Sequence, residues 1–411
     1  MARILYCWEL GEDLGHISNF LPVALALRAR GHTVIAALRE LGRAETVFGP
    51  HGIPLLQAPV WLQPPSEAPH PPQSFAEMLI HFGFADPSGL TAMLRAWRNL
   101  LALADPDLMI ADHGPTALLA ARSCGVPSAT YGAGFFLPPF TTPLPKLRPW
   151  LNIPAKRLFG NEQAVLAGAN TALATFGAPP LETLADLYRG AEHFLMTYPE
   201  LDQFAMRTSG EYRGVILSAP SGVAPEWPFG AGPKVFAYLK PQFADLEKLL
   251  TLLTAMDCRV LLYCGGLPAR ARADLSNSRI RISPRPYDIR RAAAECDLAL
   301  CHAGHGTVAA ILLAGKPLML LPFQLEQFLL SQRVAQLGAG VFIDPDSREK
   351  DHAGALRALL TDSRFAANAR AFAQKYSSAM QPQIIAAIAE RCEKMLRADV
   401  GRDRHAPTAL D

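Results

Sequence analysis

The order of strand-forming and helix-forming segments at the start of the chain constrains the fold more than any other feature of the sequence. Residues 3–8 (RILYCW) form a short run of strand-forming residues, and residues 20–30 repeat apolar side chains at helical spacing until Gly31. A glycine at that place typically ends a helix, and residues 33–38 return to strand character. This order predicts a βαβ unit, the building block of a parallel sheet.

The same alternation recurs along the chain. In the first half we expect a strand, a helix and a strand at 107–111, 115–124 and 127–131. In the second half we expect them at 234–239, 243–256 and 259–264, followed by a strand at 298–301, a helix at 308–314 and a strand at 317–321. Two such series predict two doubly wound halves.

The two series are separated by residues 219–233 (APSGVAPEWPFGAGP), whose proline and glycine content is typical of an interdomain linker. We therefore expect an N-terminal domain over 1–218, this linker, and a C-terminal domain over 234–398. A flexible tail is expected over 399–411. The alternative that the last helix packs back on the N-terminal domain stays open.

Composition and charge exclude several classes of protein. Hydrophobic residues make up 50% of the 411 residues and charged residues 18%, which excludes a disordered chain. The net charge of +2 offers no basic surface to nucleic acid. The longest apolar stretch, 308–322, is shorter than a membrane-spanning helix and is interrupted by Lys316. The first residues lack a signal-peptide pattern, and the seven cysteines form no Cys-x-x-Cys pair, so we expect a cytoplasmic protein with reduced thiols.

A glycine-rich turn carries the most informative chemistry. In residues 297–307 (DLALCHAGHGT) a strand ends at Cys301 and a helix begins near Gly306 and Thr307. The backbone N–H groups at a helix start bind anions, and such loops lie at the carboxyl ends of parallel strands. His302 could add a further donor to a phosphate oxygen. The alternative is that Gly304 and Gly306 only permit a tight turn.

Three C-terminal stretches, HAGHGT, AGKPLMLLPFQLEQ and QRVAQLGAG, resemble the donor-binding signature of the UDP-glycosyltransferase superfamily. The N-terminal stretch LGHISNFLPVALALRARGHTV is similar to the start of that family, and the bacterial natural-product and macrolide-type enzymes are the nearest type. The resemblance implies an α/β protein with the GT-B fold. In that fold two Rossmann-like doubly wound parallel-sheet domains face each other across a cleft, the first binding the acceptor and the second the nucleotide sugar.

The resemblance also implies roles for individual residues of the donor site. His302 would contact the diphosphate, next to Gly304, Gly306 and Thr307. Glu326 and Gln327 would accept hydrogen bonds from the sugar hydroxyls, because carboxylate and amide oxygens suit the paired donors of a polyol. The alternative is that they are only the polar start of a helix. Lys240 could reach the diphosphate, and Tyr287 could stack on the base.

Two positions depart from the family pattern. Ala310 occupies the place of a ribose-binding glutamate, and Leu330 replaces a frequent asparagine. The identity of the nucleotide therefore stays open.

His16 matches the catalytic base of the family, and Asp112 matches its partner at the end of a strand. A neutral imidazole can take the proton of an acceptor hydroxyl near physiological pH, and a carboxylate then stabilises the imidazolium. The alternatives are a loop histidine and a helix-capping aspartate.

The acceptor pocket is expected to contain aromatic side chains of the N-terminal half and its two proline-rich loops, 60–75 and 135–154. An aromatic-lined cleft suits a small lipophilic alcohol or phenol. The alternative is that several of these side chains fill the core. The candidates are Phe82, Phe84, Trp97, Phe135, Phe136, Phe140 and Trp150.

These observations predict an inverting, metal-independent glycosyltransferase that uses a UDP- or dTDP-linked sugar, needs no cofactor and could form a homodimer. Three alternatives stay open. An NAD-dependent dehydrogenase is disfavoured because the first loop lacks Gly-x-Gly-x-x-Gly, although Glu40 lies where a ribose-binding acid would be. A nucleotide-sugar epimerase or hydrolase, or a catalytically silent GT-B activator, would share the fold without the reaction.

Overall fold

The computed structural model describes residues 1–12, 15–62, 71–204, 207, 210–217, 222–378 and 380–398. The expected tail over 399–411, the first part of the expected linker and residues 63–70 of the first proline-rich loop lie outside the described residues. The chain forms two compact units. Unit 1 comprises Met1–Thr197, Phe204–Gly214 and Pro382–Asp411, and unit 2 comprises Tyr198–Gln203 and Val215–Gln381. The helix that ends the described chain therefore belongs to unit 1.

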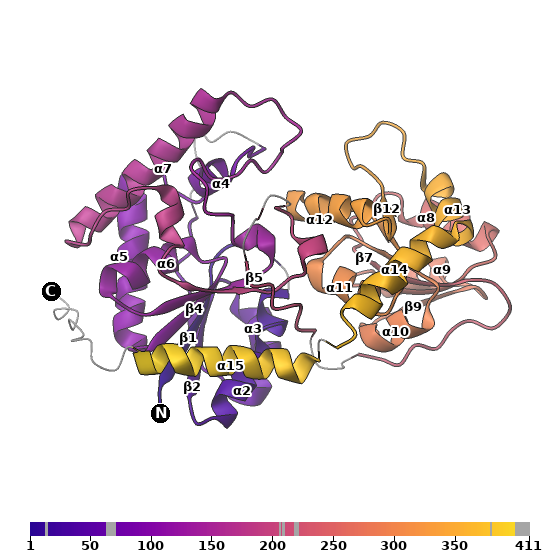
Figure 1. Ribbon diagram of the computed structural model, residues 1–411. Helices are drawn as coiled ribbons and strands as arrows, with labels where there is room; N and C mark the ends of the chain where they lie inside the picture. The colour runs from indigo at the N-terminus through magenta and orange to yellow at the C-terminus, as the bar shows by residue number, and fades with distance from the viewer. Residues whose placement is uncertain are drawn as a thin grey trace. The chain divides into compact units, whose positions relative to one another are not determined.

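Unit 1 is built on a six-stranded sheet in which all neighbouring strands are parallel, in the order β3-β2-β1-β4-β5-β6. Figure 1 labels β1, β2, β4 and β5 of this sheet. The strand order reverses between β1 and β4, and the carboxyl ends of such strands are where ligands bind in doubly wound sheets. The strands are β1 (Arg3–Trp8), β2 (Thr33–Leu38), β3 (Leu55–Gln57), β4 (Leu108–Asp112), β5 (Ser128–Gly132) and β6 (Glu192–Leu195).

The helices of unit 1 follow from local sequence signals. Helix α5 begins where the side chain of Asp86 accepts a hydrogen bond from the N–H of Gly89 at 3.0 Å, with a proline at the first helical position. Its buried residues recur at helical spacing along one face. The helices are α1 (Gly15–Ser18), α2 (Leu21–Ala29), α3 (Leu41–Phe48), α4 (Phe75–His81), α5 (Pro87–Ala104), α6 (Pro115–Cys124), α7 (Ala155–Thr175) and α15 (Gln381–Ala398).

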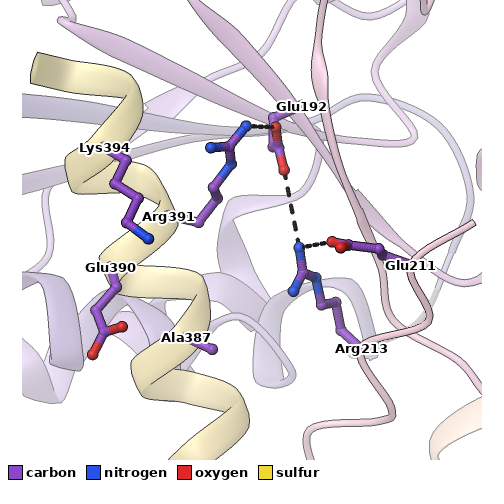
Figure 2. Close-up of a pocket in the computed structure, with 7 residues that line it drawn as sticks. All are labelled: Glu192, Glu211, Arg213, Ala387, Glu390, Arg391 and Lys394. Atoms are coloured by element: carbon purple, nitrogen blue, oxygen red, sulfur yellow. Dashed lines mark hydrogen bonds and ion pairs between the residues drawn. The ribbon is translucent and has the colours of Figure 1, made fainter. Parts of the chain in front are cut away.

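Helix α15 contacts the amino end of β6 through an ion pair. Its Arg391 donates to Glu192, the first residue of β6, at 2.6 Å, and Glu192 lies 4.0 Å from Arg213, which also pairs with Glu211 (Figure 2). These side chains line a charged hollow of about 600 Å³. Because it lies at the amino end of β6, it is at the opposite edge of the sheet from the residues that follow β1 and β4.

Unit 2 repeats the architecture with a second six-stranded parallel sheet, in the order β12-β11-β10-β7-β8-β9. Its strands are β7 (Lys234–Leu239), β8 (Arg259–Cys264), β9 (Ile280–Ser283), β10 (Leu298–Cys301), β11 (Leu318–Leu320) and β12 (Gly340–Phe342). Its helices are α8 (Leu246–Ala255), α9 (Ala269–Leu275), α10 (Ile289–Glu295), α11 (His305–Leu313), α12 (Leu325–Gln336), α13 (His352–Thr361) and α14 (Ser363–Lys375).

Alternating side chains of the unit 2 strands form two separate cores. On β10, Ala299 and Cys301 belong to one buried cluster, whereas Leu298 and Leu300 belong to the other. Since successive side chains of a strand point to opposite faces, the sheet is covered by helices on both faces. The prediction of an α/β protein with two doubly wound parallel sheets is thereby confirmed.

Candidate active site

The predicted catalytic pair lies at the carboxyl ends of adjacent strands in unit 1. Asp112 is the last residue of β4, and its register partner on β1 is Trp8. His16 lies in the short helix α1, which follows β1. Nδ1 of His16 is 3.0 Å from Oδ2 of Asp112, and both residues are buried. The structure therefore brings the two side chains together where the strand order of the sheet reverses.

Tyr6 of β1, which the sequence analysis did not single out, also contacts this pair. Its hydroxyl lies 2.9 Å from Oδ2 of Asp112 and also contacts the backbone carbonyl of His16. Burial, followed by the nearby Asp112 carboxylate, raises the pKa of Tyr6 well above its usual range. The phenol therefore keeps its proton and can donate to the carboxylate, which holds Asp112 in its orientation toward His16.

Aromatic rings enclose His16 on two sides. The indole of Trp8 stacks on the imidazole, with ring centroids 5.1 Å apart and planes at 17°. The ring of Phe136 lies 4.7 Å from that of His16 at an angle of 50°. The indole is itself fixed, because its N–H donates to the carbonyl of Leu10 at 2.7 Å. The imidazole is therefore restricted in its orientation toward Asp112.

Two glycines leave room for these side chains. Gly11 has a φ of +90°, and a β-carbon at this position would lie 2.8 Å from Nε2 of His16. Gly132 has a φ of +143°, and a β-carbon there would lie 3.0 Å from Oδ1 of Asp112 and 3.1 Å from the ring of Phe136. A larger residue at either position would displace the pair or its aromatic neighbour.

Two further titratable residues, one directly after β1 and one directly after β4, were not found from the sequence. Glu9 accepts hydrogen bonds from the N–H groups of Thr116 and Ala117 at 2.9 and 3.2 Å, at the start of α6, and burial raises its pKa to about 7. His113 has a φ of 45°, and its burial, together with the nearby His16, lowers its pKa well below the usual range.

The predicted acceptor aromatics lie in different environments. Phe136 contacts His16, and Phe135 lies edge-on to Phe136 with ring centroids 5.8 Å apart. Phe140 stacks on Tyr188 with centroids 6.2 Å apart, Phe82 is half-buried after α4, and Trp150 is exposed.

Phe84 and Trp97 require a correction. Both are fully buried, so neither offers a surface to a ligand. They fill the core of unit 1, as the packing alternative predicts, because Phe84 follows α4 and Trp97 lies on the buried face of α5.

In unit 2 the glycine-rich turn leads directly into a helix. Gly304 is the N-cap of α11, which begins at His305, so Gly306 and Thr307 lie in its first turn. The N–H groups of a first helical turn have no acceptor within the helix, and the helix dipole adds positive potential there. Burial lowers the pKa of His305 to about 4, so this ring is neutral at pH 7. The turn has the local geometry of an anion site.

His302 is placed differently from its predicted role. Its Nδ1 is 2.7 Å from the carbonyl oxygen of Leu321, and its Nε2 accepts the N–H of Lys240 at 2.8 Å. These partners require the neutral tautomer with the proton on Nδ1. The ring therefore links the end of β10 to the segments after β7 and β11. Its contact with a diphosphate stays a prediction, and it would need one of these bonds to be exchanged.

Glu326 and Gln327 lie in the first turn of α12, where the alternative also places them. The side-chain oxygen of Gln327 accepts the N–H groups of Phe323 and Gln324 at 2.9 and 3.3 Å. This oxygen therefore caps the helix, as the alternative has it. The contacts of Gln327 and the half-buried Glu326 with sugar hydroxyls stay predictions.

Tyr287 also differs from the prediction. It is 6% exposed and packs edge-on against Phe236, and an isolated β-bridge joins it to Val223. The structure therefore gives no open ring face for a base. Ala310 and Leu330, where the family pattern has polar groups, are buried in the core of unit 2.

The described part of the chain contains no group of three or more histidine, cysteine, aspartate and glutamate side chains placed to hold a metal ion. None of its helices is both long and apolar enough to cross a membrane.

The fold and this site together define a class of protein. It has two doubly wound parallel sheets, with a histidine–aspartate pair on one sheet and, on the other, a helix start with the local geometry of an anion site. Comparisons with known proteins agree. The family described as "Erythromycin biosynthesis protein CIII-like, C-terminal domain" matches residues 247–395. The L-demethylnoviosyl transferase of Streptomyces niveus is 27% identical over 400 residues, covering 91% of this chain and 94% of that protein.

A further relative and two solved structures extend this agreement. The UDP-sugar-dependent glycosyltransferase 52 of Dictyostelium discoideum is 37% identical over 75 residues, a stretch that spans only 4% of its length and 18% of this chain. The glycosyltransferase VinC in complex with dTDP has a TM-score of 0.67 at 18% identity, over 95% of this chain and all of that one.

The spinosyn rhamnosyltransferase SpnG with the spinosyn aglycone has a TM-score of 0.67 at 17% identity, over 96% of this chain and all of that one. At these identities the structures establish the fold, which is GT-B. In sequence and fold the chain is similar to natural-product glycosyltransferases, and these similarities agree with the prediction of a glycosyltransferase.

Proposed function

We propose that this protein transfers a sugar, with inversion at the anomeric carbon, from a UDP- or dTDP-linked donor to a hydroxyl group of a small lipophilic acceptor. The observation that carries the proposal is the buried contact of 3.0 Å between His16 and Asp112 at the carboxyl ends of β4 and β1. A base held by a carboxylate at the switch point of a doubly wound sheet suits proton removal from an alcohol.

In the proposed reaction, the two ring nitrogens of His16 have separate tasks. Nδ1 carries the ring proton and donates a hydrogen bond to Asp112, so Nε2 presents its lone pair to the acceptor. Nε2 takes the proton of the acceptor hydroxyl while the hydroxyl oxygen forms a bond to the anomeric carbon. The bond from this carbon to the diphosphate oxygen breaks, and its electron pair leaves with the nucleoside diphosphate. Attack from the face opposite the leaving group inverts the centre.

The leaving diphosphate gains negative charge, and the start of α11 is the part of the chain suited to stabilise it. The N–H groups of the first turn and the helix dipole are fixed in advance, so they need no reorganisation during the reaction. A related structure that contains dTDP supports a nucleotide at this fold. We propose that no metal ion or other cofactor takes part.

The acceptor is proposed to be a lipophilic alcohol or phenol because the environment of His16 is aromatic. Trp8 and Phe136 surround the imidazole, and Phe135 continues this surface. The aglycone named with the related rhamnosyltransferase structure supports a natural-product acceptor.

The experiment is incubation of the purified protein with UDP- and dTDP-sugars and a panel of phenols and polyketide alcohols, followed by mass spectrometry for a glycoside. We expect a product whose anomeric configuration, measured by NMR, is opposite to that of the donor. His16→Ala should abolish transfer, and His51→Ala, an exposed histidine of the same unit, should not. Transfer that survives His16→Ala would refute the base. Free sugar without an acceptor would indicate the hydrolase alternative, and binding without turnover the silent activator.

A further inference from the structure

The imidazole of His16 belongs to a cluster of four rings in unit 1. Trp8 stacks on His16 at 5.1 Å, Phe136 lies 4.7 Å from His16, and the ring of His113 lies 4.7 Å from Phe136. Trp8 is 2% exposed and His16 7%, so water has little access to their contact. The near-parallel planes of Trp8 and His16, 17° apart, place the imidazole over the indole face.

An aromatic face attracts a cation whose centre lies within about 6 Å of the ring centroid, and indole does so most strongly. The attraction grows when the pair is removed from water. A neutral imidazole gains little from this contact, whereas an imidazolium gains much. The contact with Trp8 therefore acts mainly on the protonated form of His16, which is the form that proton removal from an acceptor produces.

Other charged and titratable groups near His16 also affect the stability of its protonated form, beside the contact with Trp8. Asp112 is the one carboxylate in an ion-pair contact with the imidazole among the described residues. His113 adds no repulsion, because burial keeps its pKa well below the usual range and its ring neutral. The guanidinium of Arg39 donates to the carbonyl of Gly11 at 2.7 Å and lowers the pKa of His113. Tyr6, whose hydroxyl contacts the backbone carbonyl of His16, is a further titratable neighbour.

We propose that Trp8 is a positioning residue of the base: its indole face holds the His16 ring toward Asp112 and stabilises the positive charge that the ring gains during proton transfer. The inference rests on the proposed function, in which His16 is the base. It assigns to the last residue of β1 a role that burial in a core would not give it.

The sign of one measurement separates this role from simple packing. If Trp8 only excludes water, its replacement by a smaller side chain hydrates His16 and raises the pKa of the imidazole, because burial disfavours the charged form. If the indole face stabilises the imidazolium, the same replacement lowers that pKa. Trp8→Met keeps an apolar side chain that fills irregular space, and Trp8→Phe keeps a weaker aromatic face.

The pKa of His16 can be measured by NMR on protein with labelled histidine, with the signal assigned among the 11 histidines through His16→Gln. We expect Trp8→Met to lower it by roughly one unit and Trp8→Phe by less. Trp97→Phe is the matched control, because Trp97 is a fully buried tryptophan on α5 of the same unit. It should leave the His16 signal unchanged. The acidic limb of the kcat/KM profile should shift with the NMR value in each variant.

An unchanged or raised His16 pKa in Trp8→Met would overturn the proposal. If Trp8→Met does not fold, Trp8→Phe decides, and a shift no larger than that of Trp97→Phe would overturn it. The NMR measurement needs no substrate. A wild-type protein without transferase activity would therefore refute the proposed function, while the effect of Trp8 on the His16 charge is still decided by titration.

Discussion

Replacing Gly11 by alanine tests the proposed base without altering His16 or Asp112. The added methyl group would lie 2.8 Å from Nε2 of His16, whereas ordinary van der Waals contact begins at 3.4 Å. The imidazole must therefore move by several tenths of an ångström, away from the position in which it contacts Asp112. Because a misplacement of about 1 Å can cost 100-fold in rate, we expect kcat/KM to fall roughly 10- to 100-fold.

The same substitution also strains the backbone, and this effect needs a separate control. Gly11 has a φ of +90°, a conformation that costs an L-residue about 1–2 kcal/mol. Gly31 has a φ of +86°, and a β-carbon there would meet nothing within 4 Å. Gly31→Ala therefore imposes comparable strain in the same unit without approaching the imidazole.

The assay compares kcat/KM and thermal unfolding of the two variants on the best donor and acceptor pair found. Both should lose a similar amount of stability, whereas only Gly11→Ala should lose transfer activity. Equal activity in Gly11→Ala and Gly31→Ala would refute the argument that Nε2 of His16 must be accessible beside Gly11.

Three further predictions concern stability. Burial raises the pKa of Glu9 from its ordinary 4.5 to about 7, so its neutral form contributes stability below pH 4.5 that is lost as pH rises through 7. In urea unfolding, the wild type should lose up to about 3 kcal/mol of unfolding free energy between pH 5 and pH 8. Glu9→Gln should lose less. Gln327→Ala should destabilise the protein by about 1–2 kcal/mol in urea unfolding because it leaves two N–H groups at α12 without their acceptor, whereas Gln327→Glu keeps the acceptor and should not. Arg391→Ala should cost at most about 1 kcal/mol, and the difference from wild type should shrink in 1 M NaCl, because the ion pair with Glu192 is partly exposed.

The repeated strand and helix patterns were sufficient to predict both sheets, because apolar periodicity and helix-ending glycines act locally. The pairing of His16 with Asp112 was predicted from the family resemblance. His16 follows β1 and Asp112 ends β4, and the carboxyl ends of parallel strands lie at one edge. Periodicity does not determine strand order, and the contact between His16 and Asp112 depends on β1 and β4 being neighbours.

Polar residues with expected ligand roles proved harder to interpret. His302 and Gln327 match donor-site positions, yet their side chains satisfy backbone groups at the ends of β7, β11 and α12. A buried N–H or carbonyl group must find a partner, and a nearby side chain supplies it when the chain turns out of secondary structure. Sequence motifs record which residue is present but not which backbone group it must satisfy.

The residues missed around His16 share one physical reason. Tyr6 and Trp8 lie two positions apart on β1, so they point to the same face of the sheet. In a strand buried on both faces, an aromatic residue at such a position is normally a core residue. Only the spatial neighbours distinguish them: Tyr6 reaches the carboxylate of Asp112, and Trp8 covers the imidazole of His16. The hydroxyl of Tyr6 and the indole of Trp8 thus come from β1, a strand whose sequence indicates packing alone. Residues that support the base lie on the strand that pairs with β4, which carries Asp112.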